Sequence, residues 1–141
     1  RLLKKFATAA KLVPQPEVRA AARKTRLGVI YFGSTAPSMD EALVALAEDG
    51  IHLDAMRLKA FPFPDSVAEF IDSHAHVFVV EQNRDAQMRT LLINELELDP
   101  AGLTPVLHYD GTPITARFIT AAITKHVHAL AVAPRRERNA V

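Results

Sequence analysis

The stretch Leu27-Gly28-Val29-Ile30-Tyr31-Phe32 decides the fold class of this chain, because it is a continuous apolar run that ends at Gly33. A run of this length without polar alternation is typical of a strand that is buried on both faces of a sheet. The apolar residues 42–47 follow it, and Gly50 supplies a helix stop. This order predicts a βα unit with a short link.

The same alternation continues along the chain. Further strands and helices are expected in turn at residues 51–58, 66–71, 77–81, 85–97, 104–108 and 114–130. Ser38 and Ser66 each precede a glutamate by three residues, which predicts that capping boxes open the helices after them. Strands that alternate with helices through short links predict an α/β fold, with a mainly parallel sheet between two layers of helices.

The composition indicates one globular domain. The chain has 141 residues, of which 49% are hydrophobic and 23% are charged. We expect the α/β domain to span residues 27–133. Before it, we expect a helix at residues 1–12 and a basic inter-domain linker up to residue 26, because prolines interrupt any regular pattern there. Residues 134–141 are expected to be a basic flexible tail.

The net charge of +1 is unevenly distributed. Residues 1–26 hold eight basic residues against one acid, whereas residues 27–133 hold fourteen acids against six bases. This basic arm either lies against an acidic surface, of its own chain or of a neighbour, or is simply a solvated amphipathic helix. Phe6 is the only aromatic residue of the arm, which argues against nucleic-acid binding. Because the chain begins at Arg1 and not at Met, we expect a piece of a longer chain.

The inventory of reactive side chains excludes several kinds of site. The chain has no cysteine, which excludes disulfides, thiolate metal sites and a thiol nucleophile, and which permits a cytoplasmic location. Its apolar runs are strand-sized, so no membrane-spanning helix is expected. Gly28 and Gly33 have the spacing of a phosphate-binding loop, but Ser34 occupies the lysine position. His74 and His76 have no third metal ligand at a suitable spacing, so we expect no catalytic, cofactor-binding or metal-binding residue.

Three polar loops follow predicted strands, at residues 33–35, 81–83 and 108–112. We expect them to meet at one edge of the sheet, because parallel strands end on the same side. Such an edge either binds a small molecule or packs against another domain. Ser34 and Thr35 stand where a helix N-terminus could hold an anion, although capping and turn closure also explain them. No nucleophile with a poised acid or base is evident, so we favour packing against another domain.

The motifs of these loops, in chain order, resemble the carboxyl-terminal domain of the alpha subunit of 2-oxoacid:ferredoxin oxidoreductases. They are most similar to the 2-oxoglutarate:ferredoxin (or acceptor) type. The resemblance covers residues 27–130 and rests on residues 31–35, 41–43, 58–64, 79–83, 87 and 109–113. Each motif is weak alone, but several in order at matching spacing are specific.

The resemblance implies a transketolase C-terminal-like domain, a three-layer αβα sandwich whose five-stranded sheet has one antiparallel strand. That is one strand more than the residues themselves indicate. It also implies an enzyme that decarboxylates 2-oxoglutarate oxidatively with coenzyme A and passes electrons to ferredoxin. Thiamine diphosphate, magnesium and iron–sulfur clusters are then expected elsewhere in the assembly, because this chain lacks both cysteine and a Gly-Asp-Gly motif.

The implied role of this chain is a non-catalytic, structural one. Its expected partners are the preceding domain of the alpha subunit, the beta subunit and, through the complex, ferredoxin, with no nucleic acid and no membrane. Phe61 and Phe63, each followed by proline, are expected interface anchors unless they pack under their own loop. The candidate interface residues are Ser34, Thr35, Phe61, Phe63, Glu81, Asn83, Tyr109 and Asp110. The alternative is a free-standing α/β domain that binds a small molecule through Ser34, Asn83 and Asp110.

Overall fold

Five strands form one sheet in the order β1-β3-β2-β4-β5. The computed structural model describes residues 2–132, so Arg1 and the predicted tail at residues 134–141 lie outside the described residues. Neighbouring strands run parallel, except that β1 is antiparallel to β3. The strands are β1 Glu17–Arg19, β2 Leu27–Phe32, β3 Asp54–Leu58, β4 His76–Glu81 and β5 Leu103–Leu107.

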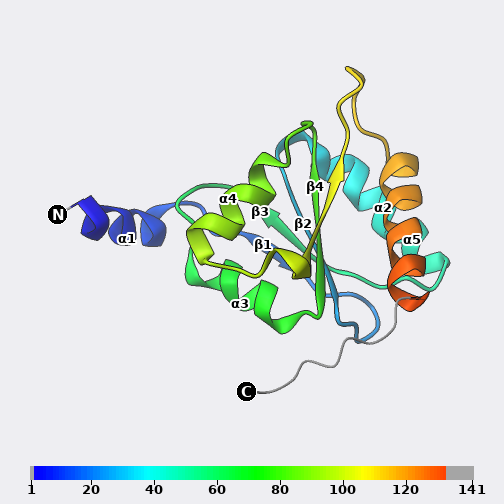
Figure 1. Cartoon of the computed structure of the whole chain (residues 1–141), viewed down its shortest axis with the longest axis horizontal. Coiled ribbons are helices and arrows are strands. Elements are labelled where there is room, and N and C mark those ends of the chain that lie inside the picture. Colours follow the sequence, from blue (N-terminus) through cyan, green and yellow to red (C-terminus); the bar gives the residue numbers. More distant parts are fainter. Residues whose placement is uncertain (1, 133–141) are drawn as a thin grey trace.

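Helices cover both faces of this sheet (Figure 1). Helix α2 (Ala36–Glu48) and helix α5 (Ala116–Val132) lie on one face, whereas helix α3 (Asp65–Ser73) and helix α4 (Gln87–Leu96) lie on the other. Helix α1 (Leu2–Leu12) extends away from this body. The expected three-layer αβα sandwich with a mainly parallel sheet is confirmed.

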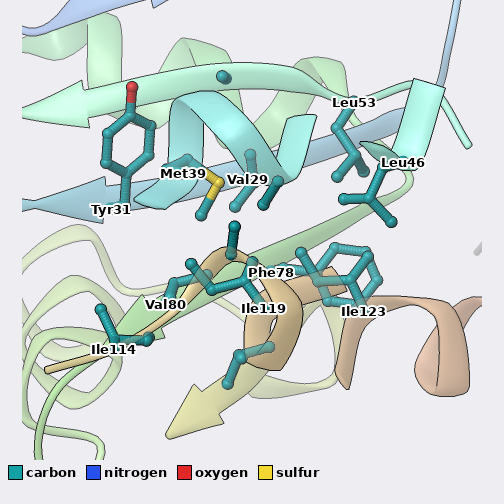
Figure 2. Close-up of a cluster of buried hydrophobic side chains, with 14 of the residues drawn as sticks. Val29, Tyr31, Met39, Leu46, Leu53, Phe78, Val80, Ile114, Ile119 and Ile123 are labelled. Carbon is teal, nitrogen blue, oxygen red and sulfur yellow. The ribbon is translucent and has the colours of Figure 1, made fainter. Parts of the chain in front are cut away.

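An apolar core fills each side of the sheet. On the α2 and α5 side, fully buried side chains from both helices gather around Phe78 of β4 (Figure 2). On the α3 and α4 side, the second core includes Ile30, Met56, Val67, Val77 and Leu92. Successive residues of β2 and β4 enter opposite cores, which explains why these strands are continuously apolar.

Strand β1 lies in the segment that we expected to be a linker. Glu17 pairs with Arg57 and Arg19 with Ala55, in antiparallel register. This supplies the fifth, antiparallel strand that the resemblance implies. Strand β1 has only three residues and all three are exposed, so periodicity could not reveal it. The α/β domain therefore includes residues 17–19, which we expected to belong to the linker before residue 27.

Ion pairs hold β1 on the body. The Glu17 carboxylate pairs with Lys59, and this hydrogen-bonded lysine keeps the pKa of Glu17 below its ordinary value. Arg19 Nη2 lies 3.1 Å from Asp40 Oδ1 at the start of α2. The basic arm thus contacts the acidic body through Arg19, whereas its helix α1 projects outward.

The two predicted capping boxes are wrong. Helix α2 begins two residues before Ser38, and the Ser38 hydroxyl instead donates to the carbonyl oxygen of Ile114 at 2.8 Å. Helix α3 begins directly after Pro64, and the Ser66 hydroxyl is buried without a hydrogen-bond partner. Pro37 in the first turn of α2 and Pro64 before α3 mark these starts, because proline needs no hydrogen-bond acceptor there.

Candidate functional site at the carboxyl edge of the sheet

The carboxyl ends of β2, β4 and β5 lie at one edge of the sheet, as their parallel register requires. From β2 the sheet continues to β3 on one side and to β4 on the other, so the direction of the connections reverses between β2 and β4. Open α/β sheets usually bind ligands at such a switch point, because the diverging connections leave a crevice. Gly33, with a φ of +59°, turns the chain from β2 into a 3₁₀ turn (Gly33–Thr35) beside it.

Gln82 links its own loop to the loop at residues 33–35 and to Ile114. Its Nε2 donates to Ser34 Oγ at 3.2 Å and to Thr35 Oγ1 at 3.1 Å. Its Oε1 accepts the backbone N–H of Ile114 at 3.5 Å, beyond the loop that follows β5. Thr35 is buried, so it offers no surface to a partner, whereas Ser34 is exposed. We did not select Gln82 from the sequence, and its place directly after a buried strand was the available signal.

Glu81 is a buried carboxylate at the amino end of α4, with only 1% of its surface exposed. Its oxygens accept the backbone N–H groups of Met88 at 2.8 Å and Arg89 at 2.9 Å, and the Asn83 side-chain amide at 2.8 Å. A carboxylate is favoured there by the free N–H groups and by the helix dipole. Contrary to expectation, Glu81 faces inward as a cap of α4 and is not available to an interface.

Asn83 is also committed to its own loop. In addition to its bond with Glu81, its Oδ1 accepts the backbone N–H groups of Asp85 at 3.1 Å and Gln87 at 3.2 Å. These bonds satisfy N–H groups just before α4 and at its first residue, which lack helical partners. Asn83 is half-buried and therefore has little free surface.

The loop after β5 presents the remaining candidates of this edge. Buried His108 places its Nε2 3.4 Å from Asp110 Oδ1. The hydroxyl and backbone N–H of Thr112 donate to the same oxygen at 2.7 Å and 2.9 Å, and these bonds lower the pKa of Asp110. Asp110 and Tyr109 are both exposed, the tyrosine by 62%. They are the candidates of this loop that a partner could contact.

Phe61 and Phe63 lie in the connection between β3 and α3. Their rings meet edge to face with centroids 5.2 Å apart. Phe61 is 43% exposed, whereas Phe63 packs against the core on the α3 side. Phe63 also lines a groove of about 710 Å³ together with Phe6 and Lys11 of α1. Phe61 is therefore the member of this pair that presents a large apolar surface to solvent.

A cleft of about 550 Å³ opens at the switch point between β2 and β4. Ser34, Gln82 and Gln87 border it with polar side chains, while Met88 and Leu91 of α4 form an apolar wall. Its volume falls within the range of small-molecule sites. The lining offers hydrogen-bond donors and acceptors but no charged side chain. Such a cleft suits an uncharged polar group better than an ion.

The described residues at this edge offer no assembled nucleophile. The Ser34 hydroxyl contacts the Gln82 amide and not a base. Within residues 2–132 no three His, Asp or Glu side chains are grouped to hold a metal ion. His74 and His76 have separate partners, Asp54 at 3.0 Å and a threonine of β5 at 2.6 Å.

Two further features were tested by the structure. Gly28 lies inside β2, where a Cβ atom would come within 3.0 Å of the Phe70 ring, so this glycine permits close packing and belongs to no phosphate-binding loop. In the described part of the chain, none of the helices is long and apolar enough to cross a membrane.

The strand order, the two helical layers and the edge cleft define an α/β domain of the transketolase C-terminal-like kind. One similar solved structure is 2-oxoglutarate:ferredoxin oxidoreductase from Magnetococcus marinus with 2-oxoglutarate, coenzyme A and succinyl-CoA bound, with a TM-score of 0.76 and 23% identity. The match covers 89% of this chain and 22% of that chain, so this chain spans about a fifth of its length.

Two other solved structures share the fold. A split-gene transketolase, described as an inactive beta4 tetramer, matches with a TM-score of 0.62 and 18% identity over 79% of this chain and 41% of its own. The alpha chain of a probable 2-oxoacid ferredoxin oxidoreductase from Thermoplasma acidophilum matches with a TM-score of 0.54 and 22% identity, over 81% of this chain and 97% of its own. No protein-family model and no curated protein sequence matches. These likenesses confirm the expected fold.

Proposed function

We propose that this chain is a non-catalytic assembly domain of a 2-oxoacid:ferredoxin oxidoreductase, of the kind found at the carboxyl end of the alpha subunit. The observation that carries the proposal is the shared fold with the Magnetococcus marinus enzyme over 89% of this chain. The ordered motifs at residues 31–35, 79–83 and 109–113 support it independently, because a shared fold alone does not define a function.

The proposed enzyme decarboxylates 2-oxoglutarate oxidatively with coenzyme A, giving an acyl-CoA and carbon dioxide, and reduces ferredoxin. The residues of this chain do not fit the cofactors of that reaction. The sequence has no cysteine for an iron–sulfur cluster, and the described residues contain no acidic cluster for a magnesium ion. We therefore propose that thiamine diphosphate, magnesium and iron–sulfur clusters lie in other parts of the enzyme, and that the complex is cytoplasmic.

The proposed partners are the preceding domain of the alpha subunit and the beta subunit, with ferredoxin reached through the complex. Exposed Phe61 and Tyr109 are suited to anchor such contacts, because large aromatic side chains contribute most to binding when an interface buries them. Ser34 and Asp110 provide exposed polar groups on the same domain. The hydrogen bonds of Glu81 and Gln82 hold these loops in place without a partner.

Reconstitution tests this proposal. Reduction of a viologen dye that depends on 2-oxoglutarate and coenzyme A is measured for this chain alone, for the rest of the alpha subunit with the beta subunit, and for the mixture. Activity is expected in the mixture and not in this chain alone. A mixture with no gain in activity, although circular dichroism shows every piece folded, would overturn the assembly role. Phe61→Ala should weaken the gain, and Val44→Ala on exposed α2 surface is the matched control.

The switch-point cleft supports a second candidate function, a free-standing domain that binds a small polar molecule. The probe is an uncharged amide, nicotinamide, at millimolar concentration, because the cleft has no charged side chain; binding is read as a change in melting temperature. Gln87→Trp should fill the cleft, since Gln87 is exposed on its rim. A rise in melting temperature that Gln87→Trp removes favours this function, whereas no rise with the uncharged amide argues against it.

A further inference from the structure

Helices α2 and α5 enclose a groove of about 790 Å³. Its charged lining residues are exposed, so the groove faces solvent and not the sheet. Small residues line it, among them Ala45, Ala121, Thr120 and Thr124. The hydroxyl oxygens of both threonines are buried, and neither has a hydrogen-bond partner. The inward faces of the same helices are filled by the core (Figure 2), so this groove is a separate surface.

Opposite charges line the two walls of the groove. Glu41 and Asp49 stand on the α2 wall, whereas Arg117 and Lys125 stand on the α5 wall. All four side chains are exposed, and none belongs to an ion pair formed within residues 2–132. The two acids are eight residues apart, as are the two bases, a separation of about 12 Å along a helix.

Along the direction of the two helices, Glu41 is level with Arg117, and Asp49 is level with Lys125. The hydrogen bond from Ser38 Oγ to the Ile114 carbonyl oxygen, 2.8 Å long, brings the starts of the two helices together. Glu41 and Arg117 each lie three residues beyond that contact. Both helices run away from the carboxyl edge, because each follows a strand that ends there.

We propose that this face binds a second copy of the same chain, about a two-fold axis parallel to α2 and α5. That rotation places α2 of one copy over α5 of the other. It leaves the position of each residue along the helix direction unchanged. Glu41 then faces Arg117 of the second copy, and Asp49 faces Lys125, with each pair formed twice. A symmetric interface must be complementary to itself, and this pattern of charges meets that requirement.

The charges also favour a two-fold axis parallel to the helices over one that runs across them. A two-fold axis across the helices would place α2 on α2 and bring acid against acid, which opposes association. The small side chains in the groove allow two helical layers to approach closely. The face lies apart from the carboxyl edge, so this inference does not depend on the proposed function.

Sedimentation velocity of the whole chain over a concentration series tests the proposal. The wild-type chain should form dimers that dissociate on dilution and in high salt. Glu41→Arg and Arg117→Glu should each weaken dimerisation by about tenfold or more, because each creates two like-charge contacts. The double variant E41R/R117E should restore dimerisation to within about threefold of the wild type, since it exchanges the signs of that pair. Glu95→Arg on exposed α4 is the matched control and should have no effect.

Three outcomes would overturn the proposal. They are a chain that is monomeric at every concentration, single variants that associate like the wild type, and a double variant that does not regain dimerisation. A monomeric chain would leave the groove to a different subunit. Ala121→Trp adds an independent check, because it should fill the groove and prevent dimerisation while the folded monomer remains, as shown by circular dichroism.

Discussion

The carboxyl edge of the sheet and the outer face of α2 and α5 both carry polar residues, but they differ in what those residues contact. At the edge, the Glu81 carboxylate accepts three N–H donors, and the Gln82 amide bonds at both its nitrogen and its oxygen. On the helical face, the hydroxyls of Thr120 and Thr124 are buried without partners. A buried polar group in a folded protein normally has a partner, so these two hydroxyls contribute no hydrogen bond to the fold, unlike the groups at the edge.

This difference separates polar side chains that stabilise the fold from charged side chains that are available to another molecule. The sequence shows a dense polar loop at residues 81–83, and the structure shows that its side chains cap α4 and tie loops together. The helical face has an ordinary amphipathic sequence, yet it has four charges with no ion pair among the described residues. Substitutions at the edge should therefore change folding stability, and substitutions on the helical face should change association.

The largest effect is expected at Glu81. Glu81→Ala leaves three partly buried N–H donors without an acceptor and should lower the free energy of unfolding by about 3 kcal/mol. Urea unfolding followed by circular dichroism measures the loss. Glu81→Gln keeps the shape and an acceptor, so its loss should be smaller. A loss below about 1 kcal/mol for Glu81→Ala would show that the edge does not depend on this cap.

Gln82 should matter less, because its side chain is exposed. Gln82→Met keeps the length but removes the bonds to Ser34, Thr35 and Ile114, and should cost about 1 kcal/mol. Local hydrogen exchange of the Ile114 amide should also rise. Gln87→Met, on the same rim, is the matched control, since the Gln87 side chain has no such role. Equal effects of the two substitutions would contradict the bridging role of Gln82.

On the helical face, a substitution should not lower the free energy of unfolding. Thr120→Val removes a buried hydroxyl that has no partner and keeps the β-branched shape. The free energy of unfolding should stay constant or rise by up to about 1 kcal/mol, when measured on dilute protein. A clear loss of stability would mean that the hydroxyl is hydrogen-bonded in the folded chain. Thr115→Val is a suitable control, because the Thr115 hydroxyl accepts the backbone N–H of Phe118. Its removal should lower the free energy of unfolding.

The sequence predicted the layers because β2 and β4 are apolar at every position that enters either core. It predicted that the loops would share an edge because parallel strands end together. It could not predict β1, whose three exposed residues depend on pairing with β3 and on distant charges such as Lys59. It also could not show the Ser38 bond to Ile114, which joins residues 76 positions apart. Local patterns carry no information on such partners.

The smallest effect concerns the other end of β4, where His76 begins the strand that Glu81 ends. Burial, with a smaller contribution from the charge of His126, lowers the pKa of His76 below the ordinary value of 6.5. The folded chain therefore binds fewer protons than the unfolded chain just below pH 6.5, so stability should fall as the pH drops through that range. Because His76 is half-buried and solvent screens part of its charge, this loss should be the smallest of the four effects. His76→Gln can still reach Thr104, whose hydroxyl lies 2.6 Å from Nε2, but it does not titrate. Unfolding in urea at pH 7.5 and 5.5 should therefore show a smaller acid-induced loss in this variant than in the wild type, and equal losses would remove His76 as the source.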